Sequence, residues 1–213
     1  MKKAWTWSEI VIASGNRHKV EELEALLSQR LGIRVVGLQE WEGLPSVEED
    51  RDTFEGNAIK KAEEIAKVLN RPTVADDSGL AVDALKGAPG VYSARYAGLN
   101  ATDEENNHKL LLSMKDVPEP QRTASFVCAM ALAVPEGKSQ VVRGECPGRI
   151  TTSPAGKNGF GYDPLFFIPE QGCTMAELTP SEKNQISHRA RAAEKFVTLL
   201  EKLYHFSPDN RGE

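Results

Sequence analysis

The chain has 213 residues, 40% of them hydrophobic and 27% charged, which is typical of one soluble globular domain, with or without two lobes. Its net charge of −5 argues against a surface that coats nucleic acid, but not against a small basic pocket for an anion. Three widely spaced cysteines form no CxxC pair, which disfavours a disulfide framework or a structural zinc site and favours the reducing cytoplasm. No apolar run is long enough for a signal peptide or a membrane span.

The first predicted elements are a buried strand over residues 9–14 and an amphipathic helix that ends at Gly32. Between them, a glycine lets the backbone approach a ligand, and the amides of a helix start favour anions. We therefore predict a phosphate-binding loop of six residues: Ser14, Gly15, Asn16, Arg17, His18 and Lys19. The alternative is an ordinary strand-to-helix turn with a surface lysine, since the P-loop pattern is missing.

A second strand is predicted over residues 33–38, and an acidic, irregular segment follows over residues 40–52. Such a run of charge is usually a solvated loop. The functional alternative is that one of its glutamates reaches a cation bound farther along the chain. After this segment, Thr53 is a good N-cap, and an apolar stripe that begins at Phe54 predicts a helix ending at residues 70–72.

Two adjacent acids, Asp76 and Asp77, follow a short buried strand predicted over residues 72–75. Two carboxylates in an apolar context are expensive to bury unless positive charge meets them. Mg²⁺ prefers hard oxygen ligands such as carboxylates, so a bound Mg²⁺ is the obvious way to balance the charge of the two acids. The alternative is a strand-ending turn, since Asp76, Asp77, Ser78 and Gly79 are residue types common in turns.

The middle of the chain predicts a long loop, a helix and a hairpin. Glycines and Pro89 break up residues 84–98, and long shaped loops are often functional. Thr102 with the acids after it is typical of a capped helix start. Alternation over residues 122–134 predicts a strand that turns and runs back toward residue 150.

Glycines flank Phe160, which leaves both faces of its ring approachable. An exposed aromatic ring near an acid, here Asp163, suits stacking on a planar base and hydrogen bonding to the edge of that base. The alternative is a glycine-rich loop that packs on itself. Residues 164–168 predict another buried strand.

The last predicted element is a helix capped by Ser181, with an apolar stripe through residues 186–203. Lys183, His188 and Arg189 lie in its first two turns. Positive side chains there oppose the helix dipole, so we infer that they bind an anionic or carbonyl-bearing group. The alternative is an exposed helix of mixed charge.

Together these segments supply the groups that would bind a nucleoside triphosphate with Mg²⁺. Six motifs occur in order: residues 13–19 (ASGNRHK), 53–58 (TFEGNA), 75–80 (ADDSGL), 87–96 (GAPGVYSARY), 159–164 (GFGYDP) and 187–189 (SHR). In these motifs the chain resembles the inosine triphosphate pyrophosphatase family, also called XTP/dITP diphosphatases, in its bacterial form. Ser14 stands where the family often has Thr, and the hydroxyl is kept.

The resemblance implies an α/β fold, an elongated mixed β-sheet flanked by helices, with two lobes and an active-site cleft between them. It implies one domain over residues 1–213, in which 1–8 and 205–213 are extensions. The implied activity is Mg²⁺-dependent hydrolysis of ITP, dITP or XTP to the nucleoside monophosphate and pyrophosphate, which cleanses the nucleotide pool. The implied protein is a cytoplasmic homodimer without nucleic-acid or membrane partners.

The resemblance also implies residue roles. Asp77 accepts a proton from the attacking water and binds Mg²⁺, with Glu48 as the second metal ligand and Glu49 as its alternative. Asp76 is a supporting acid, and Ser78 hydrogen-bonds a phosphate. The loop 14–19, together with Lys183, neutralises the triphosphate. The residues expected around the base are Phe160, Gly161, Tyr162, Asp163, His188 and Arg189.

Selectivity is expected at the base edge. A 6-oxo group accepts hydrogen bonds, whereas the 6-amino group of ATP donates them, so donors from His188 or Arg189 match the first and mismatch the second. Rejection of GTP, which also has a 6-oxo group, must involve its 2-amino group.

Two rival functions come from other classes. One is a nucleotide sensor without turnover, against which Asp77 and Glu48 argue. The other is a pyrophosphatase for pyrimidine or modified nucleotides, against which Phe160, His188 and Arg189 argue. A Nudix hydrolase is disfavoured because its glutamate-rich helix signature is missing.

Overall fold

The computed structural model describes residues 2–15 and 17–206. The chain forms two compact units, which we describe one at a time. The first unit comprises residues 1–77, 129–143 and 192–213, and the second comprises residues 78–128 and 144–191.

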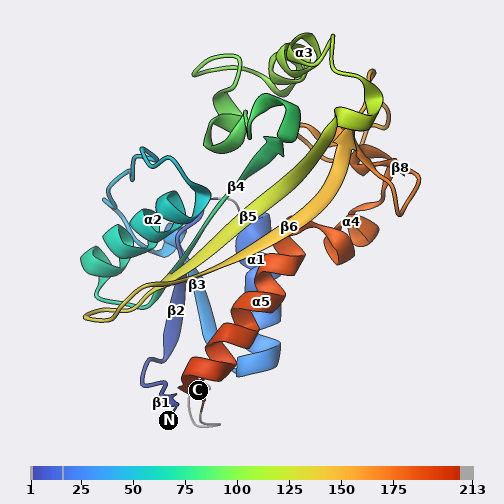
Figure 1. The fold of residues 1–213 in the computed structure, drawn as a ribbon. Coiled ribbons are helices and arrows are strands. Elements are labelled where there is room, and N and C mark those ends of the chain that lie inside the picture. Colours follow the sequence, from blue (N-terminus) through green and yellow to red (C-terminus); the bar gives the residue numbers. More distant parts are fainter. Residues whose placement is uncertain (1, 16, 207–213) are drawn as a thin grey trace. The chain divides into compact units, whose positions relative to one another are not determined.

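The first unit is built on parallel strands. Strand β2 (Glu9–Ile12) pairs with β3 (Arg34–Gly37) and with the start of β4 (Thr73–Val82). Helix α1 (Arg17–Leu31) connects β2 to β3, and helix α2 (Phe54–Leu69) precedes β4. The two helices lie on opposite sides of these strands (Figure 1). Strands covered on both faces are apolar throughout, which explains the buried run at residues 10–12.

The predicted ends of α2 are confirmed. The Thr53 side chain accepts a hydrogen bond from the Gly56 amide, and Asn70 ends the helix in the left-handed conformation at φ 49°. The cap fixes where the helix starts, and therefore which of its side chains face the strands.

The predicted turn at residues 76–79 is wrong. Strand β4 continues through these residues for a length of 10 residues. Polar composition suggested a turn, but β4 is a neighbour of β5 in the sheet as well as of β2, whose pairing ends at Val74, and membership of the sheet favours an extended backbone. Because successive side chains of a strand alternate between faces, Asp76 and Asp77 project to opposite sides.

In the second unit, helix α3 (Asp103–Ser113) begins with the predicted capping box between Thr102 and Glu105. This unit also contains residues 123–128 of β5 (Thr123–Ala133) and residues 144–150 of β6 (Gln140–Ile150). Strand β6 pairs antiparallel with β7 (Phe166–Ile168), which pairs with β8 (Cys173–Thr174). Arg122 is buried, and its guanidinium donates to four backbone carbonyls, those of Met114, Ile150 and Thr151 at 2.6–2.8 Å and that of Val117 at 3.3 Å. Burial lowers the pKa of Arg122.

The predicted C-terminal helix is two helices, α4 (Pro180–Ile186) and α5 (His188–Leu203). Thr179, not Ser181, caps α4, because its side chain and that of Glu182 form a capping box. Ser187 adopts an extended conformation between the helices, and its hydroxyl accepts from the Ala190 amide at 3.2 Å. His188 and Arg189 therefore occupy the first turn of α5.

The two ends of the described chain meet in the first unit. Strand β1 (Lys3–Ala4) pairs in parallel with β9 (Tyr204–His205). Trp5 follows β1, is 3% exposed and packs edge-on against Tyr204, with ring centroids 5.0 Å apart. The segment predicted as an N-terminal extension is thus part of the packed structure.

The main sheet is seven-stranded and mixed, in the order β3-β2-β4-β5-β6-β7-β8, and helices flank it, which confirms the predicted α/β class. Short 3₁₀ segments complete the secondary structure: Leu38–Glu40, Asp83–Leu85, Gly90–Arg95, Glu119–Gln121, Asp163–Leu165 and Met175–Glu177.

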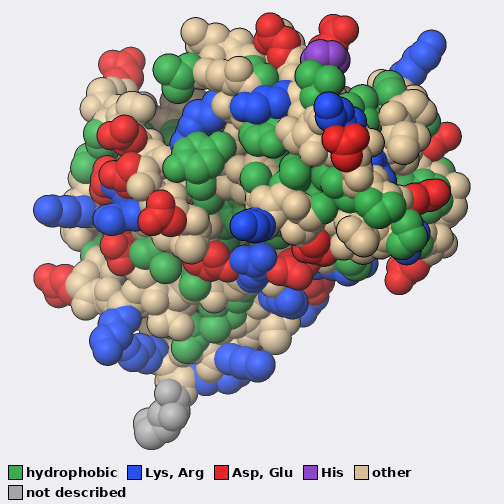
Figure 2. Space-filling view, turned by 45° about the horizontal axis from the view of Figure 1, so that its top comes forward, with side chains coloured by type: hydrophobic (Ala, Val, Ile, Leu, Met, Phe, Trp, Pro, Cys, Tyr) green, Lys and Arg blue, Asp and Glu red, His purple; other side chains and the backbone are tan. Residues whose placement is uncertain are grey.

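Acidic and basic side chains are interspersed over the face displayed in Figure 2. Among the described residues, none of the helices combines the length and the apolar character that crossing a bilayer requires.

Candidate active site

The first group of candidate residues surrounds Asp77 in the first unit. Asp77 is 9% exposed, and Nδ2 of Asn57 on α2 donates to its Oδ2 at 3.0 Å. Asn57 is itself 1% exposed, and its Oδ1 accepts from the Arg51 amide at 2.9 Å. That second bond fixes which end of the amide faces the acid, so Asn57 holds the Asp77 carboxylate in a defined orientation.

Lys61 of α2 joins Glu49 to β4. Its ammonium forms an ion pair with Oε1 of Glu49 and donates to the backbone carbonyl of Asp76 at 3.1 Å. The side chain of Glu48 is exposed, and its backbone carbonyl accepts from the Lys60 ammonium at 2.8 Å. These contacts place the Glu49 carboxylate, the predicted alternative, beside the strand that carries Asp77.

Lys60 secures the same acidic segment from outside. Its ammonium lies 2.9 Å from Oδ1 of Asp50, and this hydrogen bond lowers the pKa of Asp50. The acidic segment is therefore held to α2 by two consecutive lysines rather than being the freely solvated loop that its composition suggests.

The donor set around Asp77 fits a magnesium ion. Carboxylate oxygens are the ligands that Mg²⁺ prefers, and protein sites commonly supply only one or two of them, with the rest from water and substrate phosphates. Among the described residues, no group of three or more His, Cys, Asp or Glu side chains is arranged to enclose a metal by itself. Asp77 with one glutamate therefore suits a metal that is shared with a phosphate ligand.

The predicted phosphate loop lies partly outside the described residues. Ser14 is half-buried and its amide donates to the Ile12 carbonyl at 2.8 Å. Gly15 is exposed, and a Cβ added there would meet nothing within 4 Å. The prediction for Asn16, and the side chains of Arg17, His18 and Lys19, lie outside the described residues, although residues 17–19 form the start of α1.

The second group lines a cavity of about 240 Å³ in the second unit. Every substrate-binding residue predicted from residue 78 onward contributes to it: Ser78, Phe160, Gly161, Tyr162, Asp163, Lys183, His188 and Arg189. Its wall combines aromatic rings with acids and cations, which suits a planar base with polar edges.

The buried Asp163 and the half-buried Lys183 form an ion pair at this cavity. Asp163 is 3% exposed, its Oδ2 accepts from the Phe160 amide at 3.0 Å, and the Lys183 ammonium binds the same oxygen. Lys183 therefore lines this cavity, and its predicted role at the triphosphate stays a prediction. Gly159 makes room for the pair, because a Cβ there would lie 2.0 Å from Oδ2 of Asp163.

The Phe160 ring is 57% exposed, as the flanking glycines predict. Two cations already lie over it: Nζ of Lys183 at 4.6 Å and Cζ of Arg189 at 5.3 Å from the ring centroid. A base that stacks on Phe160 must lie beside these cations, which brings hydrogen-bond donors to its edge.

His188 and Tyr162 are more deeply placed. His188 is 5% exposed and stacks on Phe126, with centroids 5.1 Å apart. The Tyr162 hydroxyl donates to the Ser93 carbonyl at 2.7 Å, and burial raises its pKa. Tyr162 thus anchors the Phe160 segment through its hydroxyl.

Sequence reasoning missed Asn57 and Lys61 as site residues. A signal was available, since Asn57 falls within the apolar stripe of α2, and Lys61 lies one turn later on the same helix face. A polar residue at a position that should face the strands requires a buried partner.

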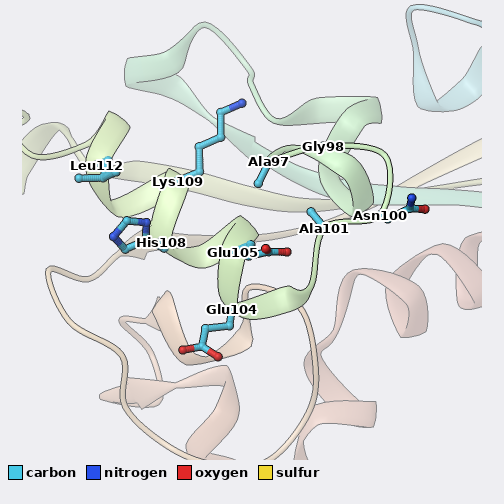
Figure 3. A pocket seen from close by; sticks show the side chains of 9 residues that line it. All are labelled: Ala97, Gly98, Asn100, Ala101, Glu104, Glu105, His108, Lys109 and Leu112. Carbon is cyan, nitrogen blue, oxygen red and sulfur yellow. The ribbon is translucent and has the colours of Figure 1, made fainter.

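A second cavity of the second unit, of about 620 Å³, contains none of the predicted residues. It lies against α3, and the side chains of Glu104, Glu105, His108 and Lys109 point in different directions (Figure 3). Catalysis needs side chains that converge on one point, so this cavity is not the candidate active site.

Residues 10–199 match the model of the Ham1 family. A dITP/XTP pyrophosphatase of Geobacillus kaustophilus is 53% identical over 195 residues, which cover 92% of this chain and 95% of that protein. One of Geobacter sulfurreducens is 51% identical over 185 residues, covering 87% and 92%. A solved structure of a HAM1 protein from Coxiella burnetii has a TM-score of 0.86 at 45% identity, covering 91% of this chain and 98% of that chain. With this match over most of its length, the chain belongs to the Ham1 family.

Proposed function

We propose that this chain is a hydrolase that converts ITP, dITP and XTP to the nucleoside monophosphate and pyrophosphate. The observation that carries the proposal is the cavity of the second unit, where Phe160, the Asp163–Lys183 pair, His188 and Arg189 come together. The relatives named dITP/XTP pyrophosphatases, about half identical over most of the chain, support the same activity.

The base is held in this cavity. It stacks on Phe160, and its 6-oxo group accepts hydrogen bonds from His188 or Arg189 at the start of α5. A 6-amino group in that position leaves two donors facing each other, which disfavours ATP. The buried Asp163, fixed by Lys183, supplies an acceptor for an N–H group of the base edge.

The triphosphate is held by the loop 14–19 and Ser78. Asp77 binds Mg²⁺ together with Glu48 or Glu49, and the contact between Glu49 and Lys61 favours Glu49. When bound, Mg²⁺ supplies positive charge that neutralises the phosphate oxygens during phosphoryl transfer. Because Ser78 directly follows Asp77, one strand serves both the phosphates and the metal.

Asp77 is also the base. Its carboxylate, oriented by Asn57, accepts a proton from the water that attacks the α-phosphorus, and pyrophosphate leaves. The Asp76 side chain lies on the opposite side of β4 from Asp77, so the two carboxylates do not bind the same cation. Asp76 is instead a supporting residue, whose backbone carbonyl accepts a hydrogen bond from Lys61.

The setting of the enzyme follows from the resemblance. A cytoplasmic homodimer without nucleic-acid or membrane partners is the assembly that we propose. The net charge of −5 and the interspersed charges of Figure 2 are consistent with the lack of nucleic-acid binding.

A nucleotide panel tests the function. ITP, dITP, XTP, GTP, ATP and dUTP are each incubated with Mg²⁺, and pyrophosphate and orthophosphate are measured separately. We expect ITP, dITP and XTP to release pyrophosphate. The kcat/KM for ATP should be at least about 100-fold lower than that for these three nucleotides. Chelation of the metal should abolish the activity. Turnover of dUTP alone would establish the pyrimidine rival, and binding without turnover would establish the sensor.

In the same assay, Asp77→Asn should lower kcat by about 10³-fold or more, because the proton acceptor and a metal ligand are lost together. The variant keeps the shape of the side chain, so its thermal melting curve should resemble that of the wild type. Near-normal turnover of Asp77→Asn would remove Asp77 as the base.

A further inference from the structure

Helix α3 holds the loop that carries Phe160. The Gly161 amide donates to Oδ2 of Asp103 at 2.6 Å, and the Gly161 carbonyl accepts from Nδ2 of Asn107 at 2.8 Å. Asp103 and Asn107 are one helical turn apart, so a single face of α3 binds both polar groups of one residue. We name this arrangement, formed by Asp103, Asn107 and the Gly161 backbone, the α3 clamp.

The clamp bears on Phe160 because that ring lies against two cationic side chains, Lys183 and Arg189, and is largely exposed rather than packed in the apolar core. It is 57% exposed, so side-chain contacts with the core do not fix its position. Its place is set by the backbone on both sides, where Asp163 accepts from the Phe160 amide and the α3 clamp holds the next residue. Gly161 sits at φ 60°, a conformation that few other residues adopt without strain.

The chemistry of the clamp is directional. A carboxylate accepts but does not donate, which matches the Gly161 amide, and only the NH₂ end of Asn107 can meet a carbonyl. Rotating the Asn107 amide would place two oxygens against each other. Each side chain is therefore specific for the group that it holds.

We propose that Asp103 and Asn107 are positioning residues for base recognition, which act by fixing Phe160 in the orientation that stacks on the purine. This inference rests on the proposed function. It adds two residues of α3 that touch neither the reacting phosphates nor the metal ligands named above. Their loss weakens ground-state and transition-state binding of the base equally.

Kinetics of single variants give the first test. Asp103→Ala and Asn107→Ala should each raise KM for ITP about tenfold and leave kcat within about twofold, as expected when uniform binding is lost. Asp103→Asn keeps an acceptor for the Gly161 amide and should restore KM to within about twofold of wild type. Asn107→Asp places a carboxylate against the Gly161 carbonyl and should be at least as damaging as Asn107→Ala.

Neighbouring residues of α3 supply matched controls. Glu104→Ala removes an acid from the same first turn as Asp103, and His108→Ala removes the residue next to Asn107. Both line the larger cavity of Figure 3 rather than the base cavity, so KM should not change. Melting curves of all variants separate a loss of folding from a loss of positioning.

A double-mutant cycle decides whether the clamp acts through Phe160. In a Phe160→Ala background, Asp103→Ala and Asn107→Ala should have no further effect on KM, because the ring that they position is gone. Binding of inosine monophosphate, measured by calorimetry without turnover, should follow the same pattern.

Two results would overturn the proposal: KM unchanged in both alanine variants, or an equal rise in KM with and without Phe160. If the wild type turns over none of the purine triphosphates, the proposed function itself has failed. Wild-type turnover combined with either of these results refutes the α3 clamp alone.

Discussion

Gly159 is the residue on which the base cavity depends most directly. It sits at φ 76°, and a Cβ there would lie 2.0 Å from Oδ2 of Asp163 and 3.2 Å from Nζ of Lys183. Both distances are too short for ordinary contact, so a side chain at this position must displace the ion pair. Conformation and space therefore both require glycine at this position.

We predict that Gly159→Ala raises KM for ITP by tenfold or more and costs more stability than backbone strain alone, which is about 1 kcal/mol for a left-handed residue. Gly172→Ala is the matched control, because Gly172 has φ 68° and open space around its Cβ position. The Gly172→Ala variant should be destabilised by the backbone strain alone and should keep the wild-type KM. Equal effects of the two substitutions on KM would show that the clash with Asp163 does not matter.

The residues singled out in the sequence from Ser78 onward do line one cavity, but their contacts with one another could not be predicted. Phe160 and Asp163 are recognisable because glycines and an aromatic ring beside an acid are unusual. That Lys183 binds Asp163, and that Asn57 binds Asp77, depends on which residues distant in the chain meet after folding. Residue types indicate the chemistry, but tertiary packing selects the partners.

At the scale of elements, the ends of helices are predicted where a cap is specific. The capping box at Thr102 and the left-handed Asn70 have chemical causes that can be seen in the sequence, whereas the cap at Thr179 was missed in favour of Ser181. Strand β4 could not be predicted past residue 75, because the residue types at 76–79 favour a turn and only their place in the sheet favours the extended form. The break between α4 and α5 was missed because the apolar stripe continues across Ser187.

We predict that Ser187→Ala lowers the free energy of unfolding by about 1 kcal/mol, because the Ala190 amide loses its capping oxygen. His188 and Arg189 follow this cap directly, so the variant should also reduce the ratio of kcat/KM for ITP to that for ATP. Ser187→Thr retains a hydroxyl and should behave as the wild type in denaturant titrations and in kinetics. A wild-type substrate ratio in Ser187→Ala would show that the cap does not position the two cations.

At the scale of the whole molecule, the family and its α/β class could be predicted because ordered motifs span most of the chain. The resemblance also implies two lobes, and the chain forms two compact units, but the positions at which the chain passes between them could not be predicted. The chain passes from one unit to the other after residues 77, 128, 143 and 191, and the first three positions lie in β4, β5 and β6 while the fourth lies in α5. Domain boundaries usually fall in polar linkers, and here no linker marks them.

The terminal sheet gives a further prediction. Trp5→Ala should lower the free energy of unfolding by about 3 kcal/mol, because a buried ring that contacts Tyr204 and Phe206 is replaced by a cavity. Trp7 is only half-buried, and Trp7→Ala serves as the control with a smaller loss in thermal melting. An equal loss of stability in the two variants would show that the contacts of Trp5 with Tyr204 and Phe206 do not stabilise the fold more than the contacts of Trp7 do.

The burial of Trp5 also makes the protein its own optical reporter. Of its three tryptophans, Trp5 is fully buried, whereas Trp7 and Trp41 are half-buried, so Trp5 contributes the emission at the shortest wavelength. Release of β1 from β9 would expose the indole to water and shift that emission to the red. The fluorescence of an unlabelled sample therefore reports separation of the two strands in real time.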